Sequence, residues 1–90
     1  MAAYHIKDYI KLMNAVTTLK DPAKSKRSKT MASNYIDKVI GDAFRKHSAG
    51  LVVPVTRIPK VYQVGREAVM EGRDLDEHMQ RAIKEHGVQL

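Results

Sequence analysis

Cysteine is absent from this 90-residue chain, and its absence excludes several kinds of chemistry at once. Without a thiol there is no disulfide bridge, thiolate zinc site, iron–sulfur cluster or cysteine nucleophile. No apolar run approaches the roughly 20 residues that cross a bilayer, and the opening MAAYHIKDY lacks the apolar segment of a signal peptide. We therefore expect a soluble intracellular protein, cytoplasmic or nucleoid-associated, that has no membrane partner.

Large apolar side chains are few, but enough of them are present for a small core. Val, Ile, Leu and Phe make up 21 of the 90 residues, which is just above the level near 20% at which highly charged chains stay disordered. A domain of this size hides only about 60 to 65% of the surface that its unfolded chain exposes. We expect a single helical domain over residues 1–90, and a homo-oligomer in which copies bury further apolar surface.

The spacing of the apolar residues predicts an all-α fold, a small bundle of four helices. Two longer helices are followed by a short extended link and then by a short helical hairpin. The first helix covers about residues 4–19 and ends before Asp21-Pro22, because a residue that precedes proline is disfavoured in helical conformation. Its apolar stripe, at three- and four-residue spacing, consists of Ile6, Tyr9, Ile10, Met13 and Val16, with Leu12 and Leu19 beside it.

The second helix has the clearest apolar periodicity in the chain. It opens either at Asp21-Pro22, as N-cap and first helical residue, or later, at Ser28 or Thr30. The segment Ser48-Ala49-Gly50 ends it. Its apolar stripe consists of Ala32, Tyr35, Ile36, Val39, Ile40, Ala43, Phe44 and His47.

The segment after the second helix is apolar but interrupted by a proline. Residues 51–55, Leu-Val-Val-Pro-Val, predict a buried extended link or an edge strand, with no partner strand elsewhere in the chain. A third helix then runs to about Glu71, with Gly72 following its C-cap. Asp74, with an acidic residue three positions later, predicts the N-cap of a fourth helix, which Gly87 closes.

The two short helices invite comparison with a helix-turn-helix, because Ala68 and Gly72 have the spacing often seen there. The helix that would read DNA begins with Asp74, Asp76 and Glu77, however, and these carboxylates would be repelled by the phosphates beside the major groove. A plain helical hairpin is the better interpretation.

No catalytic or metal-binding constellation is present in the sequence. His78 and His86 point about 80° apart on an ideal helix, and His47 lies on the apolar stripe, where a core or capping imidazole is expected. There is no nucleophile elbow and no glycine-rich phosphate loop. The lone Gly65 indicates close helix packing. We expect no enzymatic activity, no catalytic residue, no metal and no cofactor.

The net charge of +6 is unevenly distributed. Residues 20–66 carry +8, whereas residues 67–90 carry −3. The stretch 20–29 is a basic loop or helix start, and within it the run Lys24–Lys29 contains no apolar residue, so it must be solvated or bound. An excess of this sign favours polyanions.

The leading hypothesis is a protein that binds the backbone of DNA or RNA. We expect strong salt dependence and little sequence preference, because no residue set recognisably reads bases. Tyr9 and Tyr35 are assigned to the core, whereas Tyr62 could stack on a base. The candidate contacts are Lys20, Lys24, Lys26, Arg27, Lys29, Arg57, Lys60 and Arg66, with Tyr62 beside them.

A second hypothesis belongs to a different class of function. The chain could be a protein-interaction module, such as an adaptor, an inhibitor or an assembly subunit. Its basic run would then dock an acidic partner protein, and an exposed apolar stripe would supply the affinity. In a nucleated cell, Lys24–Lys29 could also serve as an import signal, which would leave the role of the domain open.

Overall fold

The computed structural model describes the backbone of residues 6–89 and the side chains of residues 9–89. Four helices pack against one another, which confirms the predicted all-α bundle. The elements are α1 (Ile6–Lys20), α2 (Lys26–His47), β1 (Leu51–Val52), the 3-10 turn η1 (Val55–Arg57), α3 (Ile58–Met70), α4 (Leu75–His86) and β2 (Val88–Gln89). Residues 4 and 5, with which the first helix was predicted to start, lie outside the described residues.

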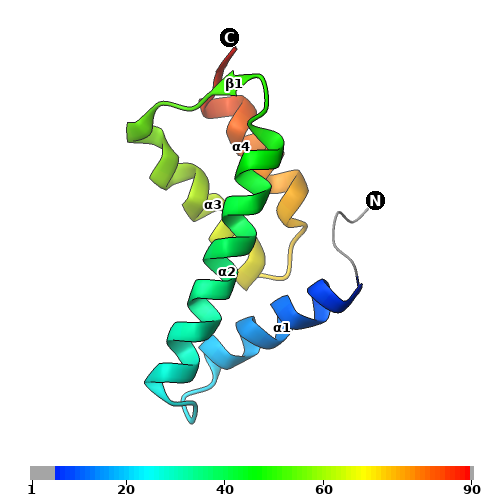
Figure 1. Cartoon of the computed structure of the whole chain (residues 1–90), viewed down its shortest axis with the longest axis vertical. Helices are drawn as coiled ribbons and strands as arrows, with labels where there is room; N and C mark the ends of the chain where they lie inside the picture. The colour runs from blue at the N-terminus through cyan, green and yellow to red at the C-terminus, as the bar shows by residue number, and fades with distance from the viewer. Residues whose placement is uncertain (1–5, 90) are drawn as a thin grey trace.

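The long helix α2 is the central element of the fold. It runs along the length of the molecule, with α1 beside its N-terminal half and α3 and α4 beside its C-terminal half (Figure 1). The turn between α1 and α2 therefore lies at one end of the molecule, far from the two short strands. No helix within residues 6–89 is long and apolar enough to span a bilayer.

The start of α2 falls between the two predicted positions. Asp21-Pro22 does not open the helix, because the Asp21 carboxylate instead accepts a hydrogen bond from the backbone N–H of Ala23 at 2.9 Å and closes a local turn. Ser25 is the N-cap, and its Oγ accepts from the backbone N–H of Ser28 at 3.2 Å. Both predicted starts were thus wrong by a few residues.

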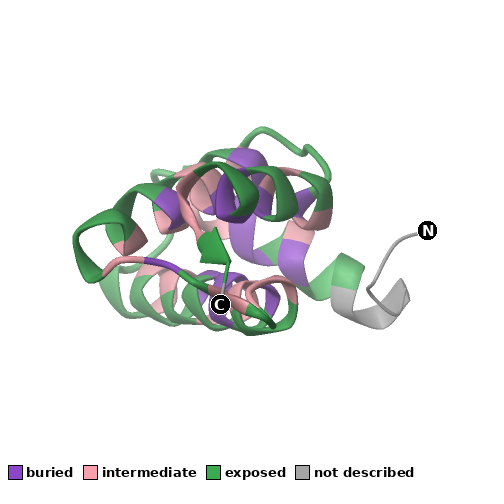
Figure 2. Cartoon of the chain, turned by 90° about the horizontal axis from the view of Figure 1, so that it is seen from above, coloured by how far each residue is buried: buried purple, intermediate pink, exposed green. Residues whose placement is uncertain are grey.

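The core lies between α2 and the α3–α4 hairpin. Figure 2 shows buried stretches that recur along the helices between exposed stretches. Gly65 allows this close approach, since a Cβ there would lie 2.7 Å from Met79 Sδ and 3.1 Å from Ile40 Cγ2. The close packing predicted for Gly65 is confirmed. The largest fully buried side chains are Ile36, Ile40, Val61, Val69, Met79 and Ile83.

The apolar stripe predicted for the first helix is partly wrong. Leu12 and Val16 are buried, but Tyr9 and Ile10 are 50% and 54% exposed, so Tyr9 is not a core residue. The reason is that α1 packs mainly on α2 and meets the α3–α4 hairpin at few points, which leaves part of its apolar surface uncovered. Tyr35, by contrast, is partly buried against the core as expected.

The link after α2 does have a partner strand. β1 pairs antiparallel with β2, with Leu51 opposite Gln89 and Val52 opposite Val88. The prediction that the link has no partner strand was therefore wrong. Strands of two residues are too short to show an alternating pattern in the sequence. Only part of the link is buried, because Val53 belongs to the core whereas Val52 and Val55 are exposed.

The α3–α4 connection follows the predicted helical hairpin. Gly72 has φ +72°, and α3 ends in a Schellman motif in which Gly72 N–H donates to Val69 O at 3.2 Å and Arg73 N–H donates to Ala68 O at 2.8 Å. Asp74 is the N-cap of α4 and accepts from the backbone N–H of Glu77 at 3.3 Å. The predicted closing residue, Gly87, is the C-cap.

Candidate nucleic-acid interface

Four of the predicted contact residues lie where α2 begins, and we call them the basic turn: Lys24, Lys26, Arg27 and Lys29. Lys24, Lys26 and Arg27 are exposed, and none of the four takes part in an ion pair among the described residues. Figure 1 shows this segment at the end of the molecule where α1 turns into α2. Its charges are therefore free to meet an external anion.

Lys29 differs from its neighbours in burial. It is partly buried, because it precedes Ala32 and Ile36 by three and seven residues and so lies at the end of the stripe that faces the core. A lysine in such a place can bury its aliphatic stem and still present its ammonium to solvent. Substitution of Lys29 would therefore change packing as well as charge.

Lys20 and Arg66 have partners within the protein. Lys20 Nζ donates to the Met70 carbonyl at 2.8 Å and so satisfies an acceptor at the C-terminal end of α3. Arg66 donates from Nη1 to Asp37 Oδ1 at 2.9 Å and from Nη2 to Ser33 Oγ at 3.1 Å. These contacts join α1 to α3 and α3 to α2. Phosphate binding by either residue stays a prediction.

The remaining candidates lie apart from the basic turn. Arg57 and Lys60 are exposed at the start of α3, near the opposite end of the molecule (Figure 1). Tyr62 is partly buried, and its ring centroid lies 5.4 Å from that of Phe44. The nine predicted residues thus do not form one patch, and base stacking by Tyr62 stays a prediction.

Sequence reasoning did not select several exposed polar residues on the outer side of α2. Lys38 is exposed and lies eleven residues, about three turns, after Arg27. Asn34 and the apolar Met31 lie between them on the same side of the helix. The eleven-residue spacing of the two cations was the available signal.

Three acidic residues lie at the start of α4: Asp74, which acts as the N-cap, and Asp76 and Glu77 in the first turn. Asp76 pairs with His47, whose Nε2 lies 2.8 Å from Asp76 Oδ1, and both side chains are less than one-fifth exposed. This pair joins the end of α2 to the start of α4. The 29 residues between its members gave no signal in the sequence.

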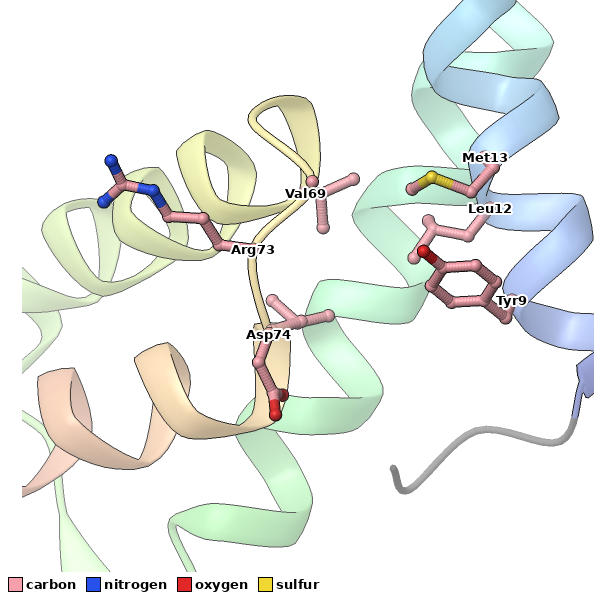
Figure 3. A pocket seen from close by; sticks show the side chains of 8 residues that line it. Tyr9, Leu12, Met13, Val69, Arg73 and Asp74 are labelled. Atoms are coloured by element: carbon pink, nitrogen blue, oxygen red, sulfur yellow. The ribbon is translucent and has the colours of Figure 1, made fainter. Parts of the chain in front are cut away.

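A small cavity of about 200 Å³ separates α1 from the α3–α4 turn. Figure 3 shows the side chains of Tyr9, Leu12 and Met13 pointing from α1 toward Val69, whereas Arg73 points away from α1. The lining is mostly apolar, with Arg73 and Asp74 as its charged residues. Such a recess suits an apolar side chain of a partner better than a charged ligand.

Within the part of the chain that the structure describes, no three His, Asp or Glu side chains gather as a potential metal site. No family model, curated protein or solved structure matches this chain.

Proposed function

We propose that this chain is a small, non-enzymatic basic protein that binds nucleic acid mainly through the phosphate backbone, in the cytoplasm or at the nucleoid. The observation that carries the proposal is the basic turn. Three of its four cations are exposed, and none of the four is neutralised by an ion pair among the described residues. Cations that are exposed and unpaired can replace the counterions that condense on nucleic acid.

The distribution of charge over the fold supports the same function. Residues 20–29 carry +4 at the α1–α2 end of the molecule, whereas residues 67–90 carry −3. The acidic helix α4 lies beside the C-terminal half of α2, away from the basic turn. A phosphate backbone that approaches the basic turn therefore meets an excess of positive charge, in which Asp21 is the one carboxylate of residues 20–29, and stays distant from the acidic residues of α4.

A titration of the full chain tests this function. Fluorescence anisotropy with random-sequence duplex DNA and with RNA, each at about 50 and about 200 mM salt, should give binding that weakens steeply as salt rises. Absence of binding to both nucleic acids at the lower salt concentration would refute the proposal.

One observation favours the second candidate function, a protein-interaction module. Tyr9 is exposed and lines the cavity that α1 forms with the α3–α4 turn, and the next residue of α1, Ile10, exposes further apolar surface. An acidic partner protein could contact the basic turn and insert an apolar side chain at this cavity. The same apolar surface supports self-association, and we propose that copies of this chain pair through it. Competition between a nucleic acid and an acidic protein for the basic turn would separate the two functions.

A further inference from the structure

The outer side of α2 carries four exposed side chains that we call the outer stripe: Arg27, Met31, Asn34 and Lys38. At about 100° of rotation per residue, they lie within a sector of roughly 60°. The buried residues Ala32, Ile36 and Ile40 occupy the opposite side of the helix. The outer stripe thus points directly away from the core, and Met31 within it is 64% exposed.

The residue types in the outer stripe are those that can contact base edges. An arginine donates two hydrogen bonds to guanine O6 and N7, and an asparagine can bond adenine at N6 and N7. A lysine donates to guanine, and an apolar side chain such as Met31 can contact the thymine methyl group. The basic turn shares Arg27 with this stripe and adds Lys24 and Lys26 for phosphates at the start of the same helix.

The charges near the outer stripe do not oppose a phosphate backbone. The two carboxylates of α2 are Asp37 and Asp42, and both are paired with arginine: Asp37 with Arg66 at 2.9 Å, and Asp42 with Arg45. Lys38, like Arg27, has no ion pair among residues 9–89. The side of α2 that faces solvent is therefore net positive along its N-terminal half.

The shape of the elements favours duplex DNA over other nucleic acids. The major groove of B-form DNA, about 12 Å wide, admits an α-helix, whereas the narrow major groove of A-form RNA does not. Single strands are bound by stacking on exposed rings. Of the tyrosines with described side chains, only Tyr9 is exposed, and it lies on α1 away from the basic turn.

We propose that α2 enters the major groove of duplex DNA, with the outer stripe on base edges and with Lys24 and Lys26 of the basic turn on the flanking phosphates. This inference rests on the proposed function and deepens it, since it adds base readout to backbone binding. The chain then prefers certain DNA sequences, in contrast to the expectation from its sequence that it binds with little sequence preference.

Selection of bound duplexes from a randomised DNA pool, followed by anisotropy on a selected and a scrambled duplex, tests the inference. Asn34→Ala removes the amide at an exposed helical position, where alanine favours the helix. The preference of the parent for the selected duplex should fall about tenfold, while affinity for the scrambled duplex and the salt slope are unchanged. The matched control Gln80→Ala removes an exposed amide from α4 and should leave the preference intact.

Each outcome separates this inference from the function on which it rests. Salt-dependent binding without any enriched sequence, an Asn34→Ala variant that keeps the full preference, or equal affinity for duplex RNA would overturn major-groove readout and leave backbone binding standing. Failure to bind any nucleic acid would remove both.

Discussion

His47 and Asp76 connect the end of one helix to the start of another, with Nε2 of the imidazole 2.8 Å from Oδ1 of the carboxylate. His47 is the last residue of α2, and Asp76 lies in the first turn of α4. The negative end of one helix dipole thus lies beside the imidazole, and the positive end of the other lies beside the carboxylate. Both dipoles favour the pair, which anchors α4 on α2.

A double-mutant cycle should detect this anchor. His47→Ala and Asp76→Ala, made singly and together and unfolded in urea, should give a coupling of about 0.5 to 3 kcal/mol. His47→Ala should lower the free energy of unfolding more than Asp76→Ala, because it removes the imidazole nitrogen that contacts Oδ1 of Asp76. The mostly buried Asp76 carboxylate would then lack a partner at both oxygens, since Oδ2 has none among the described residues. Coupling close to zero would mean that the pair does not hold α4.

Two glycine substitutions should have opposite effects on stability. Gly65→Ala places a methyl group 2.7 Å from the buried Met79 Sδ and should cost about 1 to 3 kcal/mol by overpacking, despite the better helix propensity of alanine. Gly41→Ala also lies inside a helix, but its Cβ meets Tyr62 Oη at 3.4 Å, an ordinary contact. Gly41→Ala should therefore raise the free energy of unfolding by up to about 1 kcal/mol. Thermal or urea unfolding of both variants checks the packing of α3 on α2 and α4, and a stabilising Gly65→Ala would contradict it.

Self-association should depend on the exposed part of α1. Sedimentation at micromolar concentration should show a dimer or larger species, and Ile10→Glu should dissociate it by placing a charge in an apolar contact. Val55→Glu, which lies in η1 outside α1 and is 82% exposed, is the matched control and should leave assembly intact. A parent chain that sediments as a monomer would refute this assignment.

Local signals in the sequence predicted most helix boundaries. Gly72 and Asp74 act through backbone conformation and hydrogen bonds within a few residues, so their roles could be inferred without tertiary information. The start of α2 was missed because Ser25, Ser28 and Thr30 are all residue types that suit an N-cap, and the structure uses Ser25.

Side-chain burial and pairing that depend on contacts between segments far apart in the chain could not be predicted from the sequence. Tyr9 continues an apolar stripe, but its burial depends on how far the α3–α4 hairpin extends along α1. Lys20 and Arg66 looked like free cations because their partners, the Met70 carbonyl and Asp37, are 50 and 29 residues away. The solvent exposure expected for the basic run was confirmed for Lys24, Lys26 and Arg27, and only partly for Lys29.

The salt dependence of DNA binding by a charge variant tests the central claim most directly. Lys24, Lys26 and Arg27 are changed together to glutamine, and Lys29 is kept because it is partly buried. The control changes three exposed cations in and just before α4, Arg73, Arg81 and Lys84, to glutamine, which removes the same amount of positive charge. On duplex DNA, the slope of log affinity against log salt should become shallower by up to about 2.7 in the first variant and should stay near that of the parent in the control. Equal slopes in both variants and the parent would contradict backbone binding by the basic turn.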